Sequence, residues 1–280
     1  DDRQTILDMV GCYYSLQFLL LNFKAIDVLK LELSTKTINT YNILRDFLIR
    51  TGNDFRLLSK SYIAVLLDEF LPEKHPDFNI FSVGTRVDQE DIDIGVLDRG
   101  KESRKILTKA ISKLYSEMIK HASALHFHIS EHIGEKGYSA SIQEFHAHLD
   151  NSIGNFVLLN EMMNSVPIVG NNALFDEFKQ ELLSRYYYRA GQNNKYHEGF
   201  LRGVLGEIQD LITREYEEDM LNPKKDGLRL IKGTIAALKS WKGLGDHSTT
   251  LGVLKYLYDH DIDYRDEYYR LYRSLTFLET

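Results

Sequence analysis

The chain has 280 residues, of which 43% are hydrophobic, so it can bury a substantial core. Its net charge of −7 argues against a broad nucleic-acid-binding face, which needs clustered basic residues. The single cysteine, Cys12, excludes a disulfide framework and a cysteine-based zinc site, and it favours a cytoplasmic location. The longest apolar run, Leu16 to Phe23, is shorter than the roughly 20 residues that cross a bilayer, so we expect no membrane segment.

The first part of the chain has the pattern of helices, because apolar residues recur at three- and four-residue spacing. We expect two or three helices from Thr5 to Thr51 and another from Asp54 to Phe70. The segment LPEKHP, with its two prolines, then ends this region. The sequence therefore predicts an N-terminal helical block over residues 1–72.

Two β-rich segments follow, DFNIFSVG and DIDIGVLD, and they predict neighbouring strands joined by the loop TRVDQE. A long helix is expected from Lys101 to about Ile133, although LHFHIS within it also alternates as a strand would. A turn at GEKG and a strand at GYSASI come next. These elements predict a small α/β core with a mixed sheet over residues 73–142.

Helical spacing dominates again from Gln143 to Thr280, where turns such as VGNN, AGQNN, NPKKDG and GLGD separate six or more expected helices. The sequence therefore predicts a C-terminal helical domain over residues 143–280 and an α+β fold that is predominantly α. RYYYR, Arg185 to Arg189, could stack a nucleobase, but helix packing is favoured because tyrosine is abundant throughout. Trp241 is expected in the core for the same reason.

Two acids in the second predicted strand point to a metal site. Residues two apart on a strand share a face, so Asp91 and Asp93 point the same way while Ile92, Ile94 and Val96 face the apolar layer. Such close carboxylates repel unless a cation lies between them, and Mg²⁺ prefers oxygen ligands. Gly84 and Thr85 end the preceding strand, where exposed amides and a hydroxyl could hold phosphate. An edge strand with a solvated face is the alternative explanation.

The segment VGTRVDQEDIDIGV resembles the motif of the nucleotidyltransferase superfamily, in which a strand ending in Gly-Gly or Gly-Ser precedes a strand bearing DxD or DxE. GEKGYSASIQEF, IVGNNALFDEFKQELLSRYY and LNPKKDGLRLIKGTIAALKSW follow in an order that resembles the bacterial signal-protein uridylyltransferases and their relatives. That branch has helical blocks on both sides of its transferase core.

The resemblance implies Mg²⁺-dependent transfer of a nucleoside monophosphate from a nucleoside triphosphate to an acceptor hydroxyl, which could be on a protein. Asp91 and Asp93 would hold the metal and act in catalysis. The nucleotide-binding residues would be Gly84, Thr85, Arg86, Lys225 and Arg229.

Three departures favour an alternative. The loop between Gly84 and Asp91 is shorter than in the uridylyltransferases, and their Leu-Arg-Asp appears as Leu-Arg-Leu around Arg229. The third carboxylate of the superfamily has no match in GYSASI, and candidates by proximity alone are Glu131, Glu135 and Glu144. The alternative is a degenerate, nucleotidyltransferase-like regulatory or protein-binding module without catalysis. A helical scaffold that binds no ligand is a third hypothesis.

Six histidines lie between His121 and His148. On a helix, His146 and His148 would not share a face, whereas His126 and His128 would share one on a strand and could ligate a metal. Solvated or hydrogen-bonded histidines are the favoured interpretation.

Overall fold

The structure is a computed structural model that describes residues 77–83, 93–99, 107–113, 138–187, 194–214, 222–244 and 250–279, with isolated positions between 4 and 20 and at 61, 64 and 116. It is mostly helical with one small mixed sheet, which confirms the predicted α+β, predominantly α fold class. Within the described part of the chain, no helix is long and apolar enough to span a membrane.

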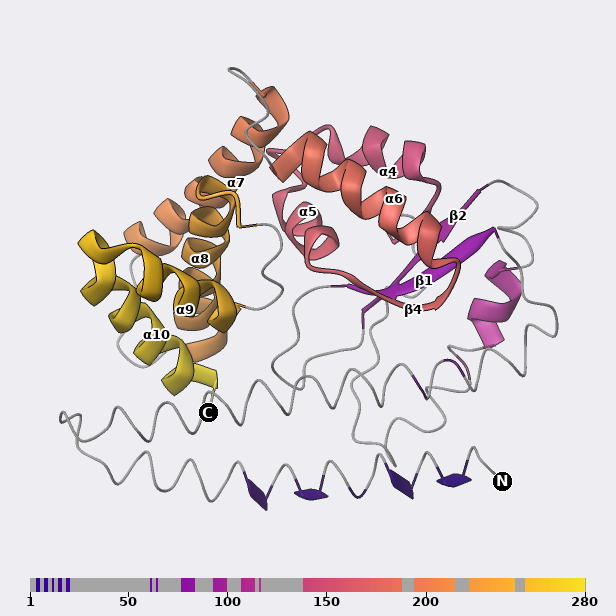
Figure 1. The fold of residues 1–280 in the computed structure, drawn as a ribbon, viewed down its shortest axis with the longest axis horizontal. Helices are drawn as coiled ribbons and strands as arrows, with labels where there is room; N and C mark the ends of the chain where they lie inside the picture. Colours follow the sequence, from indigo (N-terminus) through magenta and orange to yellow (C-terminus); the bar gives the residue numbers. More distant parts are fainter. Residues whose placement is uncertain are drawn as a thin grey trace. The chain divides into compact units, whose positions relative to one another are not determined.

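The described elements form two compact units. The first contains β1 (Phe78–Ser82), β2 (Ile94–Asp98), β3 (Ser139–Ala140), α4 (Ile142–Leu149), β4 (Val166–Gly170) and α6 (Asn172–Leu182). The second contains α5 (Phe156–Met163), η2 (Leu183–Tyr187), α7 (Lys195–Thr213), η3 (Pro223–Leu228), α8 (Arg229–Trp241), α9 (Thr250–His260), η4 (Ile262–Tyr264) and α10 (Arg265–Glu279). Each unit is described by itself (Figure 1).

The sheet has the strand order β3-β2-β1-β4. β1 pairs antiparallel with both β2 and β4, while β2 and β3 are parallel. The predicted pairing of the DFNIFSVG and DIDIGVLD segments is confirmed, and β3 lies inside the predicted strand GYSASI.

β4, with the sequence VPIVG, lies in the region where only helices were expected, so that interpretation of residues 166–170 is wrong. A proline demotes a strand prediction, because it cannot donate a hydrogen bond to the ladder. The structure accommodates Pro167 in an outer strand, at a register irregularity opposite the step from Ile80 to Phe81. The sheet thus continues past residue 142, where the sequence places the end of the α/β core; the predicted domain boundaries themselves stay a prediction.

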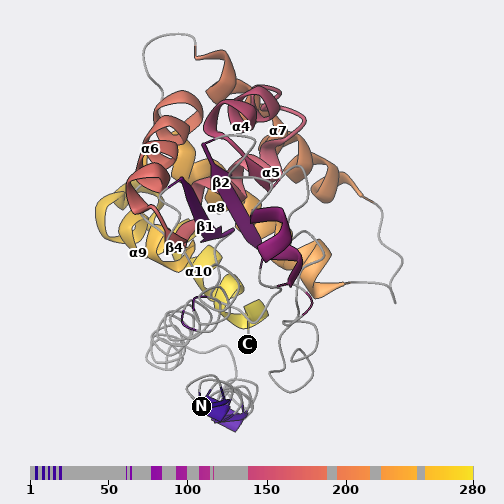
Figure 2. The same cartoon turned by 90° about the vertical axis from the view of Figure 1, so that its right-hand side faces the viewer.

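Aromatic side chains form the core on one face of the sheet. Phe81 lies opposite Gly95 in the ladder, and a Cβ atom at Gly95 would overlap the Phe81 ring. The rings of Phe175 and Phe178 on α6 lie 5.6 and 5.8 Å from that of Phe81, centroid to centroid, and Phe145 on α4 lies 6.4 Å away. Figures 1 and 2 show α4 and α6 on this side of the strands. The missing side chain of Gly95 therefore makes room for the central ring of the cluster.

The second unit is built on packed helix pairs, α7 with α8 and α9 with α10 (Figure 1). Its buried side chains include Phe200, Val204, Ile235, Leu251, Leu254, Leu257 and Leu275. Lys242, just after α8, contacts Asp261 at 2.7 Å, and the hydroxyl of Tyr268 on α10 donates to the same carboxylate at 2.8 Å. Burial and this hydrogen bond raise the pKa of Tyr268 to about 12, so it remains a donor at neutral pH.

A polar cluster fixes the RYYYR segment. The Asp150 carboxylate accepts hydrogen bonds from Arg185 at 2.6 and 2.9 Å, from the Tyr186 hydroxyl at 2.8 Å and from the Tyr196 hydroxyl at 3.3 Å. The Arg185 guanidinium also lies over the Tyr196 ring, 4.6 Å from its centroid. Tyr186 and Tyr187 are buried, so helix packing, the favoured interpretation, is confirmed for these two tyrosines.

Trp241 is 69% exposed, so its predicted place in the core is wrong. It is the last residue of α8, and Gly243, at φ 67°, ends the helix two residues later. The amides of Gly243 and Leu244 donate to the carbonyls of Ser240 and Lys239, a Schellman arrangement that satisfies the final carbonyls. The apolar character of a side chain does not by itself show whether that side chain faces the core or the solvent at the end of a helix.

Candidate functional site

The pairing of β1 with β2 brings together Val83, which precedes Gly84, and Asp93, the second acid of the DxD. Beyond the last paired residues, Ser82 and Ile94, the amide of Val83 donates to the carbonyl of Asp93 at 2.9 Å. The ladder therefore continues to the residue before Gly84 and to the second acid of the DxD. Gly84, Thr85, Arg86 and Asp91 lie outside the described residues.

Asp93 is held just before a fully buried strand. Ile94, Val96 and Leu97 are at most 1% exposed, which anchors β2 on both of its faces, while Asp93 itself is half-buried. Its carboxylate accepts no hydrogen bond from any residue that the structure describes, so its oxygens are not engaged by a donor in that part of the chain. A half-buried carboxylate in this position suits a cation ligand.

β2 itself is an inner strand, but the DxD precedes it and Asp91 lies outside the described residues, so the alternative of acids on a solvated edge stays untested. This strand pairs with β1 on one side and with β3 on the other, so it lies inside the sheet. All five of its residues are buried. Among the described residues, β3 pairs with β2 at Val96 and Leu97, and this pairing does not extend to Asp93.

The third carboxylate expected from the resemblance has no counterpart on β3, which consists of Ser139 and Ala140. Glu144, one of the candidates, has another role: its carboxylate accepts from the Ser141 amide at 2.9 Å and from the Ser141 hydroxyl at 2.7 Å. This is a capping box at the start of α4. Glu131 and Glu135 lie outside the described residues.

Two basic residues of the predicted nucleotide site, Lys225 and Arg229, lie in the second unit. Arg229 begins α8, and its Nε donates to Glu207 Oε1 of α7 at 2.8 Å. Lys225 lies in η3, and its side chain is outside the described part. The sheet edge belongs to the first unit, so a site shared by Asp93 and Arg229 stays a prediction.

Of the six histidines between His121 and His148, the two that the structure describes lie on a helix. His146 and His148 both lie on α4, two residues apart, where they do not share a face. His146 Nε2 contacts Glu181 Oε2 at 2.7 Å, and His148 is exposed. His126 and His128 lie outside the described residues. Over the described ranges, no group of three or more histidine, cysteine or acidic side chains could hold a metal ion.

The second unit also contains a cleft of about 720 Å³ that the sequence analysis missed, named here the α7 cleft. It is lined by Ile153, Phe156, Arg202, Gly203, Gly206, Glu207, Asp210, Leu211, Arg214 and Arg229. Six of these residues share one side of α7 and Arg214 follows the helix, a spacing visible in the sequence, but the other walls come from segments that only the fold brings there.

No protein-family model matches the chain, and no curated protein matches it either. Function is therefore inferred from the residues and their geometry.

Proposed function

We propose that the protein is a nucleotidyltransferase that moves a nucleoside monophosphate from a nucleoside triphosphate to an acceptor hydroxyl. The hydrogen bond from the Val83 amide to the Asp93 carbonyl carries this proposal. Gly84 directly follows Val83, and Asp91 precedes Asp93 by two residues, so the GT pair and the DxD adjoin in sequence the two residues that this hydrogen bond joins.

The donor set fits Mg²⁺, which binds through one or two carboxylates together with phosphate oxygens. Asp91 and Asp93 would hold the ion, and the half-buried Asp93 carboxylate accepts no hydrogen bond from the described residues. When bound, Mg²⁺ neutralises charge on the triphosphate and on the departing pyrophosphate.

The other predicted residues would bind and orient the nucleotide. The backbone at Gly84, with the Thr85 hydroxyl and the Arg86 guanidinium, would hold phosphate oxygens. Lys225 and Arg229 enter the proposal through the resemblance alone. Catalysis on this design is mostly positioning and charge neutralisation, with the acceptor hydroxyl held in line for attack.

A second candidate function has its own support. β3 carries no acid, and Glu144 caps α4 rather than standing free as a general base. A binding or regulatory module that retains the metal and nucleotide sites without transferring the nucleotide fits these two observations.

An assay of transfer from nucleoside triphosphates labelled on the α phosphate distinguishes the transferase from the regulatory module. The protein is incubated with each labelled triphosphate, Mg²⁺ and an extract that supplies acceptors, and label that becomes acceptor-bound is counted. We expect label from one triphosphate with the wild type and at least about a hundredfold less with Asp93→Asn. Nucleotide binding without any transfer would assign the regulatory function instead.

A further inference from the structure

The α7 cleft exists because three glycines follow one side of α7. A Cβ atom at Gly199 would overlap the Ser152 hydroxyl, and one at Gly203 would lie 2.7 Å from the ring of Phe156. Ser152, before α5, and Phe156, the first residue of α5, therefore pack directly on α7 at these two positions. At Gly206 a Cβ atom would meet no described atom within 4 Å, so no described residue covers the helix surface there, and Gly206 forms part of the cleft wall.

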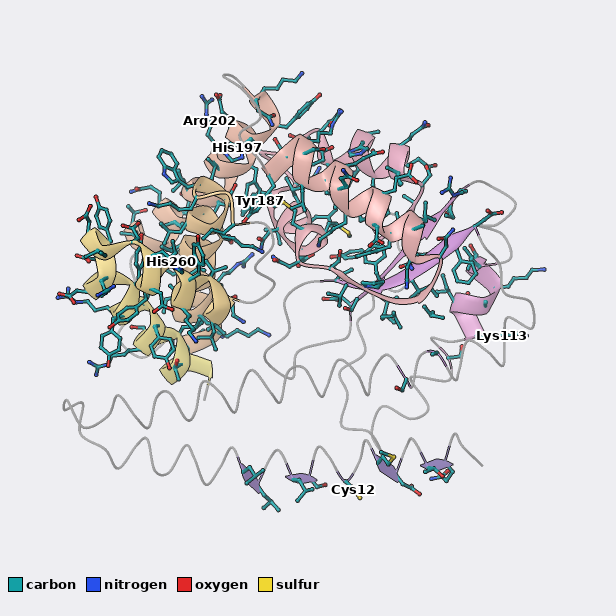
Figure 3. The ribbon with its side chains drawn as sticks, in the orientation of Figure 1. Cys12, Lys113, Tyr187, His197, Arg202 and His260 are labelled. Carbon is teal, nitrogen blue, oxygen red and sulfur yellow. The ribbon has the colours of Figure 1, made fainter. Side chains whose placement is uncertain are left out.

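The charges that line the cleft are unevenly compensated. Arg229 is paired with Glu207 at 2.8 Å, whereas Arg214 contacts Asp226 only at 3.5 Å. Arg202 is exposed and has no ion pair or hydrogen bond with any described residue; Figure 3 shows it projecting outward from α7. Three arginines against Glu207 and Asp210 leave a lining charge of +1.

Apolar surface lies beside these donors. Ile153, which is 50% exposed, and Phe156 form one wall, and Leu211 contributes to the α7 side. A volume of about 720 Å³ is in the range of small-molecule sites, which combine apolar walls with a few polar groups that fix orientation. Asp210 adds a negative charge to the wall and disfavours a long polyanion.

We infer that the α7 cleft binds a small organic anion, with a phosphate or carboxylate head at Arg202 and an apolar body against Phe156 and Ile153. Guanidinium groups bind both kinds of head through paired charge-assisted hydrogen bonds. Arg229 lines the cleft and also enters the proposed transferase function, but this inference rests on Arg202 and Gly206, which have no role there.

Calorimetry on the full chain tests it, with phenyl phosphate and benzoate as amphiphilic probes and inorganic phosphate as the head group alone. Gly206→Leu fills the cleft, and Gln209→Leu adds the same side chain at an exposed position of α7 outside it. Arg202→Gln removes the unpaired cation. Thermal unfolding of each variant shows that it remains folded.

We expect at least one amphiphilic probe to bind more tightly than inorganic phosphate. Arg202→Gln should weaken that binding about tenfold or more, Gly206→Leu should abolish it, and Gln209→Leu should leave it unchanged. The inference is overturned if neither probe binds up to about 10 mM. It is also overturned if folded Gly206→Leu binds as well as the wild type, or if inorganic phosphate binds as tightly as the probes, which would indicate an adventitious ion only.

Discussion

At the residue scale, Asp150 shows how one carboxylate organises its surroundings. Partial burial by itself raises the pKa of Asp150, but hydrogen bonds from Arg185 and Tyr186 outweigh it and hold the pKa below its ordinary value of 3.8. The same bond raises the pKa of Arg185, and burial raises that of Tyr186, so both remain donors at neutral pH. The cluster joins the end of α4 to η2 and α7.

Asp150→Asn should therefore lower the free energy of unfolding at pH 7 by about 1–2 kcal/mol, because a partly exposed charged pair and its hydrogen bonds are weakened. Since the folded-state pKa of Asp150 is depressed, its contribution is fully present above the unfolded value and is lost as pH falls through the folded value. Urea unfolding of both proteins between pH 7 and pH 3 should show the gap closing below about pH 4. A gap that stays constant over this range would contradict the account.

Gly95 permits a second prediction, because the Phe81 ring occupies the position of its missing side chain. Gly95→Ala should destabilise the fold by about 1–3 kcal/mol through overpacking of the aromatic cluster. In a Phe81→Leu background the same change should cost at least about 1 kcal/mol less, because the smaller side chain leaves room for the methyl group. Chemical denaturation of the four proteins in this double-mutant cycle measures the coupling, and additive effects would count against the proposed overlap.

At the element scale, α7 offers a matched pair of glycines. Gly203→Ala should destabilise the protein by about 1–3 kcal/mol, because its methyl group would press on Phe156, including the Cβ atom at 2.8 Å. Gly206→Ala should stabilise it by about 0.5–1 kcal/mol, because the position is open and alanine has the higher helix propensity. Thermal unfolding should shift in opposite directions for the two variants. Shifts of the same sign would show that Phe156 does not pack as described.

At the scale of the whole molecule, the sequence predicts what local patterns encode. Alternating apolar residues indicated β1 and β2, and the acid at Asp93 marked the sheet edge. β4 was not predicted, because a proline such as Pro167 argues against a strand unless that strand lies at the outside of the sheet. The sequence alone does not show which strand is an outer one. The α7 cleft was not predicted, because its walls come from residues 153–156, α7 and Arg229, which are distant in the sequence. The exposure of Trp241 depends on what packs nearby and could not be foreseen, whereas the Ser141-x-x-Glu144 spacing is a local capping-box signature that the predicted strand GYSASI obscured.

The chain passes between the two units three times in the described part, after residues 148, 163 and 181, so the sheet of the first unit is completed only after α5 of the second. The proposed function concerns this sheet, because we propose that a nucleoside triphosphate binds through Mg²⁺ where β1 and β2 meet the DxD. Asp77, at the opposite end of the hairpin, whose carbonyl accepts from the Arg99 amide at 3.0 Å, offers a matched control for the acids of the DxD.

The most direct test is calorimetric titration of ATP, GTP, CTP and UTP into the wild-type chain with and without Mg²⁺. The same titrations are made into the double variant that carries Asp91→Asn and Asp93→Asn, and separately into Asp77→Asn. The account predicts Mg²⁺-dependent binding of one triphosphate, weakened at least about tenfold in the double variant and unchanged in Asp77→Asn. Absence of Mg²⁺-dependent binding for all four nucleotides, or binding that the double variant retains in full, would contradict it.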